Sequence, residues 1–427
     1  MAKETRKKSV KAKGETTPIA TVETPAIGWA IQQPEYDARL AKTRAILDER
    51  KLDALVLFHP IRMAYVSGFF HLSTERPMAI VVGPNGTMGA LIPWLEQEHI
   101  AKSPAVTHAK VYPEYPTGGT KHPMLHLADL LAEMKLNKKG LRIGYDNNGG
   151  RDINGYDGPA LSEIVAEGIE TVSARDIIDR LRAVKSEAEL YYIIQSSIWG
   201  NLAHQLMQNK MELGRSPVEI SLEASVEASK MMLAALGPTY QQLTSTFGMP
   251  VSAGFSAGAN TSLPHGLHGG AGLRRGDILV TGAGADVAGY QSELERTMIV
   301  GEPDDNFVKY YDLMMTLQQA GFDALKPGRT FAEAEAEISA VYGELGVPEM
   351  QRHHTGHGIG LEGHEWPFID KGCPDVIEEN MVLSVEPGIY APGVGGFRHS
   401  DTVIIRSYGA ERTTFYPRDL ASMIVRL

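Results

Sequence analysis

The sequence predicts an α+β protein in which a smaller α/β domain precedes a larger domain of long helices and short strands. Its 427 residues are enough for two or three domains at about 150 residues each. In the first part, apolar runs typical of strands alternate with helical segments, which indicates an α/β layer. In the second part, long helices precede a Gly-rich region of short strands, which is typical of an α+β domain.

We place a basic, disordered tail at residues 1–30, the α/β domain at 31–184 and the larger domain at 185–427. The first 15 residues carry six Lys or Arg and two Glu, and they show no hydrophobic periodicity. Such a polar segment cannot bury enough apolar surface to fold. A transit peptide is disfavoured, because the segment is neither acid-poor nor amphipathic.

The α/β domain is predicted to begin with a helix, because ARLAKTRAILDERKL spaces its apolar residues along one helical face. Short apolar runs such as ALVLF have the composition of buried strands. The predicted elements are a helix at 38–52, strands at 54–58, 78–83 and 90–94, a helix at 125–136, a strand at 140–146 and a closing segment at 177–184.

Helix-start signals indicate where the helices of the larger domain begin. Ser186 with Glu189 and Thr330 with Glu333 have the spacing of capping boxes, in which each partner satisfies a backbone N–H group of the other. Pro217 takes the first helical position after Ser216. The predicted helices run over 186–210, 216–237, 304–325 and 330–346, and the predicted strands lie at 278–282, 297–301, 382–390 and 402–406.

Composition and charge exclude several classes of protein. With 43% hydrophobic and 22% charged residues the chain is typical of a globular protein, and no apolar run is long enough to span a membrane. The net charge is −11, so we expect no nucleic-acid partner. The single cysteine, Cys373, permits no intrachain disulfide and no cysteine zinc cluster, and we expect a cytoplasmic protein with an inert Cys373.

A histidine-rich segment, HHTGHGIGLEGHE, is the first candidate for a functional site. It places His353, His354, His357 and His364 within twelve residues, and the interleaved glycines argue against a helix. They favour a tight loop or strand edge at which backbone approaches a ligand closely. The spacing is not that of the HExxH zinc motif. Surface or structural histidines are the alternative interpretation.

Three carboxylates and one further histidine are candidates on local pattern. Glu386 ends the apolar run MVLSV, so we expect its side chain to point inward and to need a partner. Glu293 and Glu295 lie two apart in a predicted strand and share one face, which suggests a common cation. His265, in a Gly-rich loop, is a candidate general base. The alternative for each carboxylate is an exposed polar position.

Together these segments resemble the pita-bread family that includes methionine aminopeptidase, prolidase and creatinase. The matching motifs are PHG at 264–266, GDILVTGAGADVAGYQSELERT at 276–297, HHTGHGIGLEGHE at 353–365, VEPGIY at 385–390 and GGFRHSDTVII at 395–405. The resemblance implies a pita-bread catalytic domain over residues 185–427. The preceding α/β block resembles the N-terminal domain of prolidase and creatinase.

The departures from the family pattern concern the metal. Metallopeptidases of this family hold two metal ions with two Asp, one His and two Glu. The resemblance places Gly282 and Glu293 at the Asp positions, His357 and Glu386 at the next two, and Ser400 at the last Glu. Glycine has no donor atom and serine is a poor ligand. We therefore expect no dinuclear site and, in the leading hypothesis, no metal.

The leading hypothesis is a creatinase-like amidinohydrolase that hydrolyses a C–N bond of a small zwitterionic guanidino or amidine compound without metal. LERT at 294–297 is similar to the creatinase segment, whereas Thr74 and Ser400 stand where creatinase has Phe and His. The resemblance implies His265 as general base, Arg76 on the substrate carboxylate, and Glu295 and Glu386 as acceptors of a planar cation. The expected catalytic residues are His265, Glu295, His357 and Glu386, and the expected substrate-binding residues are Arg76, Thr74, Glu293, His364 and Ser400.

Three alternatives stay open. Glu293, His357 and Glu386 form a two-carboxylate, one-histidine set for one divalent metal, which suits an Xaa-Pro dipeptidase or a dimethylsulfoniopropionate-type lyase. Ring opening of a cyclic amidine, as in ectoine hydrolase, would use Glu293 or Glu295. A catalytically inactive binding protein is the third.

The family also implies a homodimer whose site lies near the interface, so that Arg76 acts in its own or the partner's site.

Overall fold

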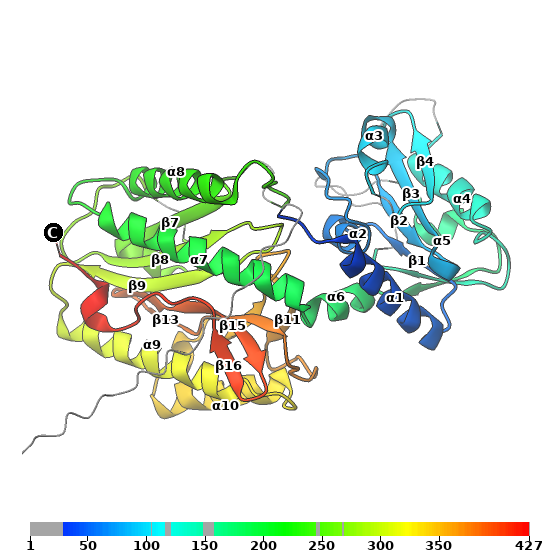
Figure 1. Ribbon diagram of the computed structural model, residues 1–427. Helices are drawn as coiled ribbons and strands as arrows, with labels where there is room; N and C mark the ends of the chain where they lie inside the picture. The colour runs from blue at the N-terminus through cyan, green and yellow to red at the C-terminus, as the bar shows by residue number, and fades with distance from the viewer. Residues whose placement is uncertain are drawn as a thin grey trace, which may run out of the picture.

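The protein has two domains, each built on one large sheet. The computed structural model describes residues 29–103, 105–115, 121–147, 158–244, 248–266 and 269–426. Figure 1 shows a smaller N-terminal domain and a larger C-terminal domain, with helix α6 (Asp176–Ala183) at their junction. The predicted tail at 1–30 lies outside the described residues except for its last two.

The N-terminal domain is a six-stranded sheet covered on both faces. The strand order is β4-β3-β2-β1-β5-β6, with β1 antiparallel to β2 and parallel to β5. The strands are β1 Ala54–Leu57, β2 Ala79–Val82, β3 Met88–Pro93, β4 His108–Tyr112, β5 Arg142–Tyr145 and β6 Glu170–Ser173, and the helices are α1 Gln33–Glu49, α2 Pro60–Ser67, α3 Gln97–Ile100, α4 Pro123–Glu133 and α5 Leu161–Ile164.

Alternation along β1 explains the two helical layers. Leu55 and Leu57 belong to one buried cluster together with residues of α1, α2 and α6, whereas Ala54 and Val56 belong to a second cluster with residues of α4. Successive strand residues point to opposite faces, so a strand apolar at every position is buried on both sides. The apolar run at 54–58 therefore confirms the predicted α/β layer.

The C-terminal domain is a mixed α/β layer built on a nine-stranded sheet. The strand path is β11-β10-β12-β15-β9-β8-β7, and β16 pairs with β15 while β17 pairs with β9. The strands are β7 Val251–Ala257, β8 Ile278–Ala285, β9 Leu294–Val300, β10 Gly356–Gly358, β11 Glu365–Ile369, β12 Val382–Val385, β15 Ser400–Arg406, β16 Gly409–Arg412 and β17 Ile424–Val425, with the separate hairpin β13 Gly388–Ala391 and β14 Gly395–Arg398.

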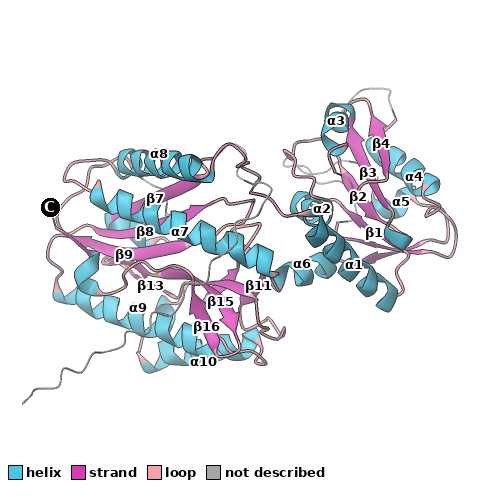
Figure 2. Cartoon of the chain, in the orientation of Figure 1, coloured by secondary structure: helices cyan, strands magenta, loops and turns pink. Residues whose placement is uncertain are grey.

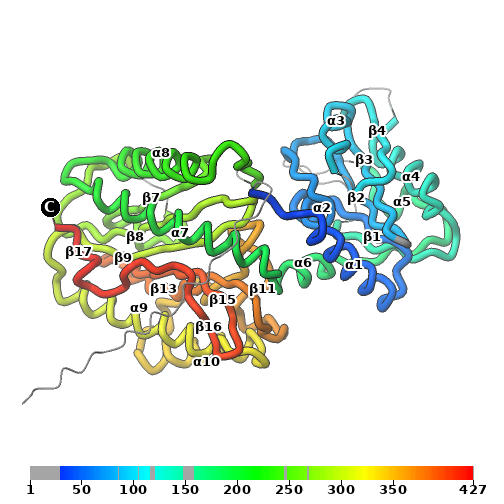
Figure 3. The backbone as a smooth tube through the Cα atoms, in the orientation of Figure 1, coloured from blue at the N-terminus to red at the C-terminus, as the bar shows by residue number. Residues whose placement is uncertain are grey.

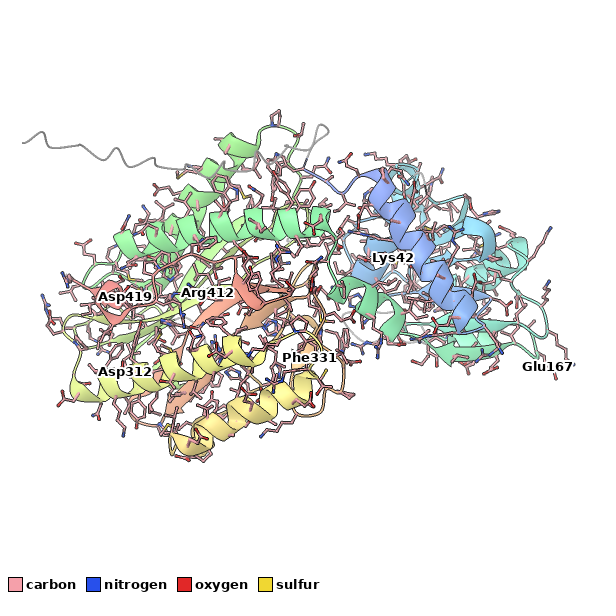
Figure 4. All side chains as sticks on the ribbon, turned by 60° about the horizontal axis from the view of Figure 1, so that its bottom comes forward. Lys42, Glu167, Asp312, Phe331, Arg412 and Asp419 are labelled. Carbon is pink, nitrogen blue, oxygen red and sulfur yellow. The ribbon has the colours of Figure 1, made fainter. Side chains whose placement is uncertain are left out.

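Four long helices flank this sheet. They are α7 Glu187–Asn209, α8 Pro217–Leu236, α9 Asp305–Ala324 and α10 Phe331–Glu344. Figure 2 shows α7 and α8 along β7 and β8, and α9 and α10 on the opposite side of the domain. Phe331 at the start of α10 is buried, whereas Asp312 of α9 is exposed (Figure 4). Of the described residues, no helix is long and apolar enough to cross a membrane.

The helix-start signals correspond to real caps. Ser186 accepts a hydrogen bond from the backbone of Glu189, and Thr330 does the same for Glu333, so both predicted capping boxes are present. The predicted strands at 278–282 and 297–301 are the antiparallel neighbours β8 and β9. The chain returns at its end, where β17 pairs parallel to β9 (Figure 3).

Some elements escaped the sequence analysis. Strand β7 reads VSAGFSA, which contains few large apolar residues, and α2 follows β1 almost at once. The small side chains of β7 are explained by its position, because it borders the cavity of the C-terminal domain. Short strands such as β10, with three residues, carry too little pattern to be recognised.

Candidate active site

A cavity of about 480 Å³ lies over β7, β8 and β9, with Tyr390 and Arg398 from the hairpin β13–β14 in its wall. Small residues on neighbouring strands leave this space open, among them Gly254 and Gly282, which are partners in the β7–β8 register. Cavities of several hundred Å³ accommodate small-molecule ligands. The cavity is therefore large enough for a compound of dipeptide size.

Three carboxylates converge beside this cavity, and two of them, Glu293 and Glu295, line it. Glu293 directly precedes β9, Glu295 is the second residue of β9, and Glu386 directly follows β12. One carboxylate oxygen of each lies within 4.8 Å of the others. Glu293 and Glu295 thus act from one face of the strand, as their spacing predicts.

His357 on β10 faces two of these carboxylates. Its Nε2 atom lies 3.3 Å from Oε1 of Glu386 and 3.8 Å from Oε2 of Glu293. Its Nδ1 atom donates to the carbonyl oxygen of Gly358 at 3.0 Å, which fixes the tautomer. In the neutral ring Nε2 therefore carries the lone pair, the arrangement found in metal-binding histidines.

Arg398 supplies the cation nearest to the carboxylates. Its Nε and Nη2 atoms donate to Oε2 and Oε1 of Glu295 at 2.5 and 2.6 Å, and Nε lies 3.6 Å from Glu386. Tyr390 accepts from Nη1 at 3.1 Å and lies 2.8 Å from Nε2 of His353. Both oxygens of Glu295 are therefore used by Arg398, whereas Glu293 and Glu386 keep oxygens that face His357.

Two serines hold the remaining oxygen of Glu293. The hydroxyls of Ser384 and Ser400 donate to Oε1 at 2.7 and 2.6 Å. Both serines are fully buried, on β12 and β15. The pair turns Oε2 of Glu293 toward His357, so Ser400 acts on the carboxylate instead of replacing it.

A second histidine covers the first. The ring of His364 stacks on His357 with centroids 3.7 Å apart, and a ring nitrogen lies within 4.8 Å of ligand atoms of Glu293 and His357. Burial, and next the charge of His357, hold the pKa of His364 below 6.5. His364 is exposed and therefore accessible to a bound molecule.

Burial and neighbouring charges shift the pKa values of the residues in this cluster. Burial raises the pKa of Glu295 to about 7 against the attraction of Arg398. Burial alone would lower the pKa of His357, but the contact with Glu386 and the charge of Glu293 raise it to about 9. Burial would likewise raise the pKa of Glu386, but His357 and Arg398 lower it to about 2. An imidazolium thus partly compensates the carboxylates.

The residues fit one divalent metal. Nε2 of His357 is buried and has no well-aligned hydrogen-bond partner among the described residues, and carboxylate oxygens surround it. Three carboxylates against one guanidinium leave a charge of about −2, which one dication neutralises. Gly282 and Ser400 contribute no carboxylate, although a Cβ atom at Gly282 would have room, 3.8 Å from Glu295. The donor set supports one metal and not two.

The structure brings most of the predicted site residues together, but not all. Those that meet at the cluster are Glu293, Glu295, His357, His364, Glu386 and Ser400. His265 is exposed in the loop, between the cavity-lining residues Pro264 and Gly266. Its charge contributes to the lowered pKa values of His353 and His364. Thr74 and Arg76 lie in the N-terminal domain, and Arg76 binds Glu75 and Glu114 there.

The sequence analysis missed Arg398, Ser384 and Tyr390. A signal was present for two of them, because Arg398 lies two residues before Ser400 and Ser384 two before Glu386. Residues two apart in an extended segment share a face, so each belongs beside its neighbour. Tyr390 carries no such local signal, because no predicted site residue lies two positions away from it.

Comparisons with known proteins give a consistent result. The model of the Creatinase/Prolidase N-terminal domain matches residues 39–184, and that of Metallopeptidase family M24 matches residues 195–407. The Xaa-Pro dipeptidase of Pyrococcus horikoshii is 31% identical over 245 residues, which are 57% of this chain and 66% of that protein. The Xaa-Pro dipeptidase of Pyrococcus furiosus is 28% identical over 391 residues, 90% and 99% of the two chains.

Solved structures agree on the fold. The crystal structure of the dipeptidase PepE from Mycobacterium ulcerans has a TM-score of 0.75 and 25% identity, and the match covers 93% of this chain and 100% of that one. The Xaa-Pro dipeptidase from Bacillus anthracis has a TM-score of 0.73 at 24% identity and covers 91% and 99%. The expected pita-bread domain with a creatinase/prolidase-type N-terminal domain is confirmed.

These findings correct the leading hypothesis. A creatinase-like, metal-independent amidinohydrolase is wrong, because the family model is that of a metallopeptidase and relatives matched along nearly their whole length are named dipeptidases. The expectation of no metal is wrong for the same reason, and the cluster offers a metal site. The loss of two carboxylate positions, at Gly282 and Ser400, does not remove the site. The remaining groups still leave an uncompensated negative charge.

Proposed function

The chain belongs to metallopeptidase family M24 and is a hydrolase, and we propose that it is a dipeptidase of the Xaa-Pro type that works with a single divalent metal. The observation that carries this proposal is the buried cluster of three carboxylates with one guanidinium and one histidine. The small cavity, and the names of the relatives that match along nearly their whole length, favour a dipeptide over a protein substrate.

Glu293, His357 and Glu386 would hold the metal. Nε2 of His357 lies 3.8 Å from Oε2 of Glu293 and 3.3 Å from Oε1 of Glu386, whereas both oxygens of Glu295 bind Arg398. A bound divalent ion supplies Lewis-acid polarisation of a carbonyl and a water nucleophile at neutral pH. Ser384 and Ser400 fix the orientation of Glu293, as outer partners of metal ligands do.

The protein's own groups bind the substrate and move its protons. The neutral, exposed ring of His364 is placed to donate to a substrate oxygen or to the leaving nitrogen. The pair Arg398–Glu295 forms a fixed wall of the cavity, which orients the dipeptide beside the ligands. His265, at the cavity rim, is the second candidate for proton transfer.

Metal removal and add-back test the proposal. We expect about one metal per chain by mass spectrometry, loss of Ala-Pro hydrolysis after chelation, and recovery with Mn²⁺, Co²⁺ or Zn²⁺. Ala-Ala serves as the substrate control. Glu386→Gln is expected to lose both metal and activity, and Glu344→Gln, at the exposed end of α10, neither. A fully active chain without metal, or a metal-loaded chain that cleaves no Xaa-Pro dipeptide, would overturn the proposal.

We further propose that the active form is a homodimer in which Arg76 serves the partner's site. Within its own chain Arg76 is paired with Glu114 and Glu75, and the same domain exposes large apolar side chains at Leu72 and Trp94. Mixing inactive Arg76→Ala with inactive His357→Ala chains tests this. Recovery of activity after mixing supports a shared site, and its absence in a chain that sediments as a monomer rejects it.

A further inference from the structure

The segment 359–365, here called the site loop, is bound through two of its carboxylates by Arg182, which lies outside the C-terminal sheet. Nη2 of Arg182, in α6, donates to Oε2 of Glu362 at 2.8 Å and also to Oε2 of Glu365. Nζ of Lys185 donates to the other oxygen of Glu365 at 2.8 Å. Arg182, Lys185 and Glu365 are all buried. One guanidinium thus holds two carboxylates three residues apart.

Arg182 is itself anchored in the N-terminal domain through its helix. Asp179, one turn earlier in α6, accepts from Nε and Nη2 of Arg62 at 2.8 and 2.9 Å. Arg62, in α2, also lies 3.5 Å from Asp146, which accepts from the backbone of Phe58 at 2.8 Å. An alternating series of charges therefore runs from the end of β1 to the site loop.

The site loop also contains His364, which lies between Glu362 and Glu365 in the sequence. The ring of His364 stacks on His357, so a shift of this short stretch moves one ring across the other. The Glu365 carboxylate also packs against the loop backbone, where a Cβ atom at Gly360 would meet Oε1 at 2.8 Å. The carbonyl of Gly360 accepts from the backbone of Gln291 at 2.8 Å, two residues before Glu293.

We propose that Arg182 is a positioning residue. By binding both Glu362 and Glu365, it fixes the ring of His364 against that of His357. The geometry of the site therefore depends on the position of the N-terminal domain. Arg182 does not touch the substrate or the metal ligands. A cavity of about 410 Å³ lies along this junction and is lined by residues of both domains, including His364. A movement at the junction therefore reaches the site through the loop. The kinetic part of the test rests on the proposed function, and the spectroscopic part does not.

The decisive readout is the Cε1–H resonance of His364 in full-length protein labelled at histidine, in the metal-free form. The resonance is assigned by its absence in His364→Gln. Stacking on His357 places it in the ring current of that imidazole, so the shift reports the ring geometry directly. We expect Arg182→Met to move this resonance or to split it into two, and Arg182→Lys to restore it in part.

The control is Arg50→Met. Arg50 also joins the N-terminal domain to α6, through two hydrogen bonds to Asp176, but it does not contact the site loop. We expect Arg182→Met to lower kcat on the order of 10- to 100-fold with little change in KM, as small misplacements of catalytic groups do. Arg50→Met should leave both the kcat and the resonance unchanged.

If Arg182→Met does not fold, Glu362→Gln serves as the second variant. It weakens the contact of Arg182 with the half-buried Glu362, and it should shift the His364 resonance in the same direction by a smaller amount. An unchanged His364 resonance in a folded Arg182→Met or Glu362→Gln variant overturns the inference, whatever the substrate. Absence of dipeptidase activity in the unmodified chain overturns the proposed function and leaves the spectroscopic result to decide this inference alone.

Discussion

Two largely buried charge clusters lie close to the site loop, and they differ in the balance of their positive and negative charges. At the domain junction, the cations Arg182 and Lys185 meet the carboxylates Glu362 and Glu365. Beside the cavity, Glu293, Glu295 and Glu386 meet one guanidinium, that of Arg398, and a titratable histidine. Burying an uncompensated charge is costly, whereas a paired set is tolerated.

The difference separates a cluster that is complete within the chain from one that needs a bound cation. The junction cluster needs nothing further, since its charges cancel within the chain. The cavity cluster is short of about two positive charges when His357 is neutral, and a dication completes it. Charge balance, more than the presence of acidic residues, therefore marks the site of chemistry in this protein.

The largest expected effect comes from removing a ligand of the unbalanced cluster. His357→Ala takes away the one imidazole that faces both Glu293 and Glu386, so the metal and its chemistry are lost. We expect activity to fall roughly 1000-fold or more, as when a central catalytic group is removed. His108→Ala, at an exposed position of β4, is the control. Retained metal content in His357→Ala would contradict the assignment.

Breaking the balanced cluster should lower the free energy of unfolding. Glu365→Ala leaves the buried Arg182 and Lys185 without their common partner. Such losses cost about 3–5 kcal/mol, and thermal unfolding measures this as a lower Tm. The matched change Asp129→Ala removes the exposed pair with Lys121, worth about 1 kcal/mol or less. Equal destabilisation by the two variants would refute the contrast.

Metal affinity should depend on pH through the unbalanced cluster alone. In the metal-free protein the pKa of His357 lies near 9, held up against burial by Glu386 and Glu293, so at neutral pH a proton occupies the ligand atom. Binding releases this proton, so affinity should rise about 10-fold per pH unit below 9 and level off above it. Calorimetry in buffers of different ionisation enthalpy measures the release. An affinity that is independent of pH between 6.5 and 8.5 would contradict this reading.

The smallest expected effect tests the serine pair. Ser400→Ala removes one of the two hydroxyls that orient Glu293 but leaves every ligand in place. We expect metal affinity to fall about 10-fold, the lower range for outer partners of ligands. Ser339→Ala on α10, away from the cavity, is the control. A drop as large as that of His357→Ala would mean that Ser400 itself binds the metal.

The sequence was sufficient for the fold and for most members of the cavity cluster. The apolar run at 54–58 and the capping pair Ser186–Glu189 determine local structure through nearby residues, so a single chain reveals them. The strand spacing of Glu293 and Glu295 likewise placed both carboxylates on one face.

What the sequence could not show is which charges compensate one another. The partner of Glu295 is Arg398, 103 residues away, and the partner of Glu365 is Arg182, 183 residues away. Such pairs arise from the packing of distant segments and leave no periodic signal. The charge of the cluster follows only when Arg398 is counted, and the missing carboxylates at Gly282 and Ser400 do not by themselves show whether a metal binds.

The most direct test of the account is the metal content of the purified chain together with that of Glu386→Gln. We expect about one divalent ion per chain in the unmodified protein and less than about a tenth in the variant, with Ala-Pro hydrolysis in proportion to the metal content. Two ions per chain, or full hydrolysis with less than about a tenth of an ion, would contradict it.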